Sequence, residues 1–155
     1  PQSVLVVIHT PALDVLLIER ADRPGYWQSV TGAKKDEDEP LVQTCIREVE
    51  EETGIRIGED PVPVSSLRDW QQANVYEIYA VWRHRYAPGV THNTEHVFAL
   101  RLPAPVPVRL DPREHRAYLW LPWQEAATKC FSWSNRDAIG ILGSAPDSAP
   151  ASCER

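Results

Sequence analysis

The sequence REVEEETGI at residues 47–55 is the most informative stretch of this chain. It follows the pattern Arg-Glu-aliphatic-x-Glu-Glu-x-Gly-aliphatic, which ordinary residue usage produces by chance in roughly one of 10⁵ chains of this size. Pro40 suits the first position of a helix, where its missing N–H costs nothing, and Gly54 suits the left-handed position just past a helix end. The stretch therefore predicts a helix of about four turns that carries many carboxylates.

The predicted helix places its carboxylates beside its apolar face. Glu48 and Glu52 are i, i+4 neighbours that border this face, and Glu51 lies about 60° further round the helix. The ordinary interpretation of a Glu-rich helix is a solvated charged face. Carboxylates at the edge of a core, however, need a compensating positive charge. The apolar arc expected to face the core consists of Leu41, Val42, Cys45, Ile46 and Val49.

A hard divalent cation would supply that charge. Mg²⁺ is usually held by carboxylate oxygens together with water and the phosphate oxygens of a substrate. Arg47 lies one turn before Glu51 and could orient a carboxylate through a charge-assisted hydrogen bond. The helix thus points to metal-assisted chemistry on a phosphate compound.

The flanking sequence predicts strands and a second helix. Residues 3–9 and 15–19 are two aliphatic, β-branched runs joined by a turn, which predicts a hairpin. A capping box at residues 134–137 predicts the start of another helix. β-branched and aromatic content predicts further strands at residues 64–68, 76–83, 96–102 and 117–121, and residues 26–30 form a short aromatic stretch.

These elements predict a single mixed α/β domain over residues 1–142. The chain has 155 residues, of which 43% are hydrophobic, and this is enough for one core. From residue 143 onward Ser, Ala and Pro predominate, so we expect residues 143–155 to form a disordered tail.

Composition argues against several classes of protein. The net charge of −6 provides no basic surface for a nucleic-acid backbone. The apolar run at residues 4–8 is far shorter than the roughly 20 residues that span a bilayer. Cys45, Cys130 and Cys153 lack the paired spacing of a disulfide framework or a zinc site. We therefore expect a cytoplasmic protein with reduced thiols and no nucleic-acid or membrane partner. As a separate expectation, we take it to be a monomer.

The pattern at residues 47–55 resembles the second half of the Nudix box. In the full box a glycine, five residues, a glutamate and seven residues precede this pattern. Glu39 stands at the expected distance before Arg47, but six residues separate it from Gly32. Either the loop is one residue longer, or Ala33 takes the place of the glycine.

This resemblance implies a fold and a chemistry. Members of the family have an α/β/α sandwich with a mixed β-sheet, and they hydrolyse nucleoside-diphosphate-X compounds with Mg²⁺ or Mn²⁺. By the resemblance, Arg47 orients the metal ligands, which are Glu48, Glu51 and Glu52.

One branch of the family, the bacterial dihydroneopterin triphosphate diphosphatases, is more similar still. The matching blocks lie largely outside the Nudix box, at residues 4–8, 27–32, 83–91, 93–95 and 132–136. The similarity implies that Glu114 completes the metal site or acts as the base, with Glu51 as the alternative base. It also implies substrate contacts by Arg20, Thr31, Tyr76, Glu77, Ile78, Tyr79 and Ser132.

The activity implied by this branch is Mg²⁺-dependent hydrolysis of dihydroneopterin triphosphate to the monophosphate and pyrophosphate, a step of folate biosynthesis. One alternative is a broader (d)NTP pyrophosphohydrolase, because a pterin triphosphate is close in shape to a purine nucleotide. Another is a catalytically silent module that binds a nucleotide, although such a module is expected to lose the carboxylates that this chain keeps. Hydrolysis of RNA ends fits the acidic charge poorly.

Overall fold

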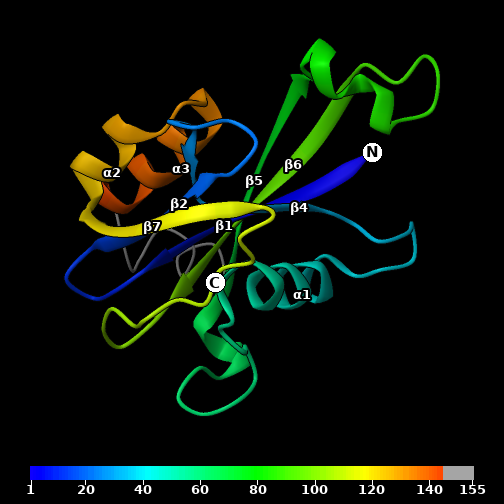
Figure 1. Cartoon of the computed structure of the whole chain (residues 1–155). Coiled ribbons are helices and arrows are strands. Elements are labelled where there is room, and N and C mark those ends of the chain that lie inside the picture. The colour runs from blue at the N-terminus through cyan, green and yellow to red at the C-terminus, as the bar shows by residue number, and fades with distance from the viewer. Residues whose placement is uncertain (145–155) are drawn as a thin grey trace.

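The computed structural model describes residues 1–144. The apolar runs near the start of the chain form the centre of a mixed sheet (Figure 1). In these residues no helix is long and apolar enough to cross a membrane. The helical elements are α1 (Leu41–Thr53), α2 (Trp123–Lys129), α3 (Trp133–Ser144) and the 3₁₀ turns η1 (Val64–Ser66) and η2 (Ala80–Arg85). The strands are β1 (Gln2–His9), β2 (Asp14–Arg20), β3 (Trp27–Gln28), β4 (Val30–Ala33), β5 (Leu67–Glu77), β6 (His92–Arg101) and β7 (His115–Pro122).

The predicted hairpin of β1 and β2 is paired only near its turn, where His9 faces Val15. Beyond this point β1 pairs with β4 and, in parallel, with β6, whereas β2 pairs with β3 and β7. The sheet therefore opens at the end away from the hairpin turn. The first residues of β1, β6 and β7 and the last residues of β2 and β5 meet at this open end.

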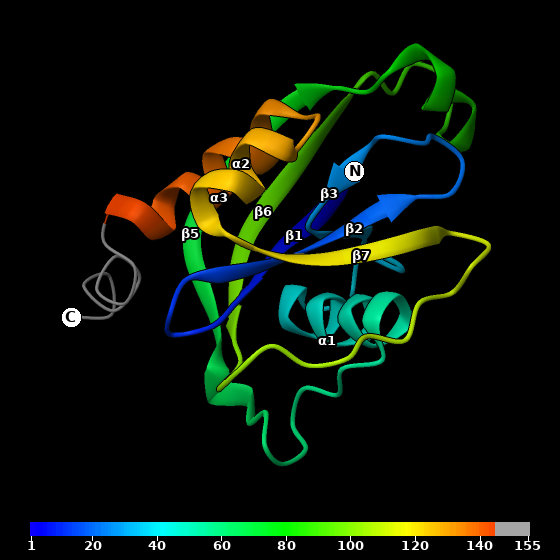
Figure 2. The same cartoon turned by 60° about the vertical axis from the view of Figure 1, so that its left-hand side comes forward.

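Helices cover both faces of the sheet (Figure 2). Val4, Val6 and Ile8 of β1 belong to the core beneath α1, whereas Leu5 and Val7 belong to the core beneath α2 and α3. This division follows from the strand, because successive side chains point to opposite faces. The structure confirms the predicted α/β/α sandwich with a mixed sheet.

Helix α1 ends as predicted, because Gly54 has a left-handed φ of 77° and its N–H donates to the carbonyl of Glu50 at 2.9 Å. Pro40 lies one position earlier than predicted, at the extended N-cap. The prediction that Val42 faces the core is wrong, since it is 39% exposed. The buried arc is rotated toward Thr44 and Glu52, so Glu52 lies within the buried face and not at its border.

Two predicted strands are wrong in their bounds. Residues 64–66 form η1, and the strand that follows is β5. Among the described strands β5 pairs only with β6, and a strand at a sheet edge tolerates polar side chains that hide its pattern. Residues 80–85 form η2 because the ring of Trp82 packs against those of Tyr26 and Tyr79. The aromatic content there reflects contacts between rings and not a pleated surface.

The other predicted strands are present. β6 begins four residues before the predicted 96–102, and β7 contains 117–121. The short aromatic stretch at 26–30 contains β3 and the first residue of β4, which the sequence does not predict as strands.

The helices of the last third of the domain also differ from the predictions. The pattern at α2 is too short to reveal a helix, and none was expected there. The N–H of Asn135 donates to the Ser132 hydroxyl at 3.2 Å, so Ser132, and not Ser134, caps α3. Helix α3 reaches Ser144, two residues past the predicted end of the domain. The rest of the predicted tail, residues 145–155, lies outside the described residues.

Replacement of glycine by alanine is expected to have opposite effects at two positions of α3. A Cβ on Gly140 would meet no atom within 4 Å, so Gly140→Ala should stabilise the protein by about 0.5–1 kcal/mol through helix propensity. A Cβ on Gly143 would overlap the ring of Trp123, so Gly143→Ala should destabilise it, as overpacking does by about 1–3 kcal/mol. Urea unfolding measures both. Equal stability of the two variants would contradict the tight contact at Trp123.

Candidate active site

A cavity of about 750 Å³ lies at the open end of the sheet. It is lined by residues from both sides of the opened hairpin, from α1, and from the start of α3. Of the predicted site residues, Arg47 and Glu51 do not line it. Those that do are Arg20, Thr31, Glu48, Glu52, Tyr76, Glu77, Ile78, Tyr79, Glu114 and Ser132.

Glu52 is the most deeply buried carboxylate of α1. It is 7% exposed, and its Oε1 has no hydrogen-bond partner among the described residues. Burial, followed by the charges of Glu48 and Glu114, raises the pKa of Glu52 well above its usual range. Burial also raises the pKa of Glu48 to about 7, against the attraction of Arg47. The charge of Arg47 therefore does not offset the burial of these two carboxyl groups.

The donor set suits a hard divalent cation. Carboxylate oxygens are the ligands that Mg²⁺ prefers, and the unpartnered oxygen of Glu52 is available to one. Within residues 1–144, no three acidic, His or Cys side chains lie together as a preformed chelating group. Glu48, Glu52 and Glu114 would thus draw closer together around an ion.

Gly32 allows the Glu48 carboxylate to lie directly on the sheet. A Cβ built on Gly32 would overlap that carboxylate, so any larger residue would displace it. Ala33, the alternative box glycine, is exposed. Gly32 therefore occupies the close-packed position, and the loop before Glu39 is one residue longer than in the family pattern.

Arg47 connects the helix to the loop before it. Its Nε and Nη2 donate to the two oxygens of Glu39 at 3.0 and 2.8 Å, and its Nη2 also donates to the Ala33 carbonyl at 3.0 Å. The bidentate contact lowers the pKa of Glu39 to about 2. The third guanidinium nitrogen, Nη1, lies 3.2 Å from a carboxylate oxygen of Glu48 and 3.7 Å from one of Glu51. This arrangement supports the orienting role expected of Arg47.

Arg47→Lys is expected to lower kcat/KM about 10- to 100-fold and to raise the metal concentration needed for half-maximal activity, since outer-shell partners of metal ligands have effects of this size. A lysine cannot reproduce the bidentate contact with Glu39. Metal titrations of activity measure the effect. Arg56→Lys is the control, because Arg56 is exposed and pairs with Glu50 and Glu59 outside the cavity. Unchanged metal dependence in Arg47→Lys would contradict the orienting role.

The two candidates for the base occupy different places. Glu114 immediately precedes β7 and lines the cavity. Glu51 is 54% exposed and contacts Arg47 on the outer side of α1. The structure thus brings Glu114 together with Glu48 and Glu52, and it does not bring Glu51 into the cavity.

His115 is a cavity residue to which the sequence assigns no role. It is buried, and its Nε2 lies 3.9 Å from Oε1 of Glu52 and 3.5 Å from Nε2 of Gln28. Burial, followed by the charge of Arg20, lowers the pKa of His115 to about 4. A neutral imidazole therefore lies beside the carboxyl group of Glu52 and supplies no positive charge to it. Sequence spacing could not reveal it, because Glu52 and His115 belong to distant elements.

Aromatic and cationic side chains form the mouth of the cavity. The guanidinium of Arg20 lies 4.7 Å from the ring centroid of Trp82 and is paired with Asp22 at 2.8 Å. Tyr79, 40% exposed, packs against the same Trp82 ring at 5.3 Å. Glu77 pairs with Arg83 at 3.3 Å. These groups can contact a flat ring or a phosphate.

The recess behind this mouth contains polar groups that the prediction did not include. Glu95 and Asn93 of β6 line it together with Ser3 of β1 and Tyr76 of β5. The Ser132 hydroxyl accepts from the side-chain amide of Asn135 at 2.8 Å. The sequence contained a signal for these groups, because residues 93–95 and 132–136 belong to the blocks that resemble the dihydroneopterin triphosphate diphosphatases.

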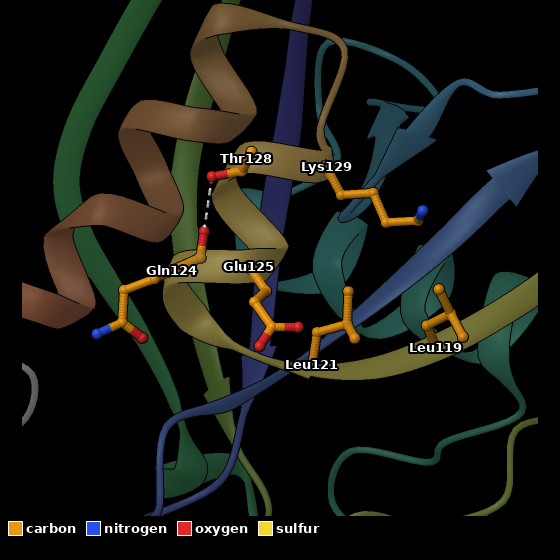
Figure 3. Close-up of a pocket in the computed structure, with 6 residues that line it drawn as sticks. All are labelled: Leu119, Leu121, Gln124, Glu125, Thr128 and Lys129. Atoms are coloured by element: carbon orange, nitrogen blue, oxygen red, sulfur yellow. Dashed lines mark hydrogen bonds between the residues drawn. The ribbon is translucent and has the colours of Figure 1, made fainter.

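A second pocket of about 510 Å³ lies between α2 and β7 (Figure 3). In the close-up, Glu125 and Lys129 extend from α2 over Leu119 and Leu121 of β7. This pocket shares no lining residue with the cavity, and its only acidic residue is Glu125. We assign it no role in the chemistry.

A family model described as the NUDIX domain matches residues 1–139. A dihydroneopterin triphosphate diphosphatase of Escherichia coli K12 is 44% identical over 140 residues, which cover 90% of this chain and 89% of that protein. One from Haemophilus influenzae is 36% identical over 140 residues, covering 89% and 84%. The solved structure of the E. coli dihydroneopterin triphosphate pyrophosphohydrolase matches with a TM-score of 0.82 at 43% identity, covering 92% and 94% of the two chains. These matches and the arrangement of α1 show that this chain belongs to the Nudix hydrolase family.

Proposed function

We propose that this chain hydrolyses dihydroneopterin triphosphate to dihydroneopterin monophosphate and pyrophosphate. The observation that carries this proposal is one cavity that joins the carboxylates of α1 to a polar recess with aromatic walls. The name of the E. coli relative at 44% identity supports the same substrate. A volume of about 750 Å³ falls within the range of roughly 300–1,000 Å³ that is typical of small-molecule sites.

Nudix hydrolases generally use divalent metal ions, and we propose Mg²⁺, or Mn²⁺ in its place. Glu48, Glu52 and Glu114 would hold the ion. When bound, it neutralises phosphate charge and lowers the pKa of water. Arg47 keeps the Glu48 carboxylate in position through the contacts described above.

The reaction needs a base and a leaving group. Water attacks a phosphorus atom of the triphosphate, the bond from that phosphorus to the departing oxygen breaks, and a carboxylate takes the proton of the water. We assign the base to Glu114, because it lines the cavity whereas Glu51 does not. Arg20 and Thr31 are proposed to bind the phosphates. Tyr76, Glu77, Ile78 and Tyr79 are proposed to form a wall of the ring site, with Ser132 as a further polar contact.

We also propose that the protein acts as a cytoplasmic monomer. Cys45 and Cys130 are free thiols buried in the two cores. Burial raises the pKa of both, to about 12 for Cys130, so neither is suited to disulfide exchange. Cys153 lies outside the described residues. A sedimentation mass near 17.5 kDa would support the monomer.

A hydrolysis assay with Mg²⁺ compares dihydroneopterin triphosphate with dATP at equal concentration and scores pyrophosphate against orthophosphate. The proposal expects a clear preference for the pterin, release of pyrophosphate, and loss of turnover with a chelator. Comparable rates would instead indicate a broader (d)NTP pyrophosphohydrolase. Tight binding without turnover would indicate a silent module.

A further inference from the structure

Glu95 is a buried carboxylate that the mechanism above does not use. It lies on β6, is 3% exposed, and lines the recess of the cavity. Glu95 lies at the end of the cavity that is formed by β1, β5 and β6. It is therefore separate from the proposed metal ligands on α1 and before β7. A carboxylate at this position costs free energy unless a partner compensates it.

The hydrogen bonds that Glu95 receives within the protein do not satisfy both of its carboxylate oxygens. The side chains of Ser134 and Asn74 hydrogen-bond to the carboxyl group, but burial outweighs them and raises its pKa to about 7. Its Oε1 is buried and has no hydrogen-bond partner among the described residues. An acceptor oxygen of this kind calls for a donor, and the cavity that Glu95 lines is where a ligand would bring one.

The neighbouring polar groups are arranged as donors. The side-chain amide nitrogen of Asn93 donates to the Ser3 hydroxyl at 2.6 Å and to the Tyr76 hydroxyl at 3.1 Å. Both hydroxyl oxygens therefore act as acceptors toward Asn93, and their hydrogens are free to donate elsewhere. Burial raises the pKa of Tyr76 to about 12, so this phenol keeps its proton. The recess thus offers a carboxylate acceptor next to hydroxyl donors.

We propose that Glu95 selects the ring of the substrate by accepting, at its unpartnered Oε1, hydrogen bonds from the adjacent ring N–H and amino groups of a 2-amino-4-oxo heterocycle. The hydroxyl groups of Ser3 and Tyr76 donate to acceptor atoms of the same ring. Hydrogen bonds from N–H groups to a carboxylate are charge-assisted, and they are stronger than hydrogen bonds between neutral groups. This inference rests on the proposed function, because it names the group that distinguishes a pterin from adenine or lumazine.

The test compares pterin with lumazine, which has an oxo group in place of the 2-amino group. Fluorescence titration of the wild type should show at least about tenfold tighter binding of pterin, because lumazine leaves the buried carboxylate without one donor. In Glu95→Gln the preference should disappear or reverse, since the glutamine amide can donate to the 2-oxo group. A purely structural role of Glu95 would weaken the binding of both rings equally.

Kinetics provide the second readout. Glu95→Gln should lower kcat/KM for dihydroneopterin triphosphate on the order of 10- to 100-fold, mainly through KM. It should change kcat/KM for dATP much less, because adenine lacks the paired donors. Glu125→Gln on α2 is the matched control, since Glu125 does not line this cavity. Melting curves of both variants establish that they fold.

The outcomes separate the two proposals. If the wild type hydrolyses dihydroneopterin triphosphate but binds pterin and lumazine equally, the role of Glu95 is overturned and the proposed function stands. If it prefers pterin to lumazine through Glu95 but does not release pyrophosphate, the ring contact is supported and the proposed reaction is overturned.

Discussion

Glu52→Gln is expected to lower kcat by on the order of 10³ or more, because metal-ion stabilisation of a phosphoryl transition state supplies several kcal/mol and each 1.36 kcal/mol is tenfold in rate. Glu52 is the buried carboxylate whose Oε1 has no partner among the described residues. An amide of the same shape cannot provide the negative charge that holds the ion. Steady-state hydrolysis with saturating Mg²⁺ measures the loss.

The same substitution should stabilise the metal-free protein. Burial and the charges of Glu48 and Glu114 raise the pKa of Glu52. Above the ordinary pKa of a glutamate, the folded state must therefore either take up a proton or hold a disfavoured charge, and both lower its stability relative to the unfolded chain. At pH 8 without metal, Glu52→Gln should melt at a higher temperature than the wild type. Mg²⁺ should raise the melting temperature of the wild type more than that of the variant.

Glu50→Gln is the matched control for both readouts, because Glu50 lies on the same helix and pairs with Arg56 at the surface. It should retain activity and its response to Mg²⁺. A Glu52→Gln protein that hydrolyses the substrate at the wild-type rate would rule out Glu52 as a metal ligand.

Gly32→Ala is expected to reduce kcat/KM about 100-fold, since a displacement of a catalytic group by about 1 Å costs this much. The added Cβ would overlap the Glu48 carboxylate, which must then move away from Gly32. The displaced carboxylate should bind metal more weakly, so the metal concentration for half-maximal activity should rise. Hydrolysis assays over a Mg²⁺ series separate this effect from a general loss of folded protein.

Gly140→Ala is the control for Gly32→Ala, because it adds the same methyl group in open space on α3. It should leave kcat/KM and the metal dependence unchanged. Full activity of Gly32→Ala would show that the close approach of Glu48 to β4 is not required for the reaction.

The helix with the carboxylates could be predicted from sequence because its determinants are local. The i, i+4 spacing of Glu48 and Glu52, the cap at Gly54 and the apolar spacing all lie within 14 residues of chain. The continuous apolar run of β1 is likewise a local feature, and such a run is typical of a strand buried on both faces. These features require no knowledge of which segments meet in space.

The bounds of β5 and η2 could not be predicted in this way. β5 lies at a sheet edge, where polar side chains are tolerated. The conformation of η2 depends on contacts of Trp82 with Tyr26, a residue from a distant segment. The burial of Glu52 also depends on how α1 is rotated against the sheet. A helical wheel drawn from the sequence gives this rotation only approximately.

By itself, the sequence determined the family, the acidic helix and ten of the residues that line the cavity. Only the tertiary structure decided that Gly32 is the close-packed glycine, that Glu114 and not Glu51 lines the cavity, and that Glu95 lies in its recess. The physical reason is that these facts depend on contacts between distant segments. The bond from the Ser29 N–H to Asn135, for example, joins residues 106 positions apart at 2.8 Å. Local spacing specifies which groups a helix or strand presents, whereas packing between elements specifies which of those groups share one cavity.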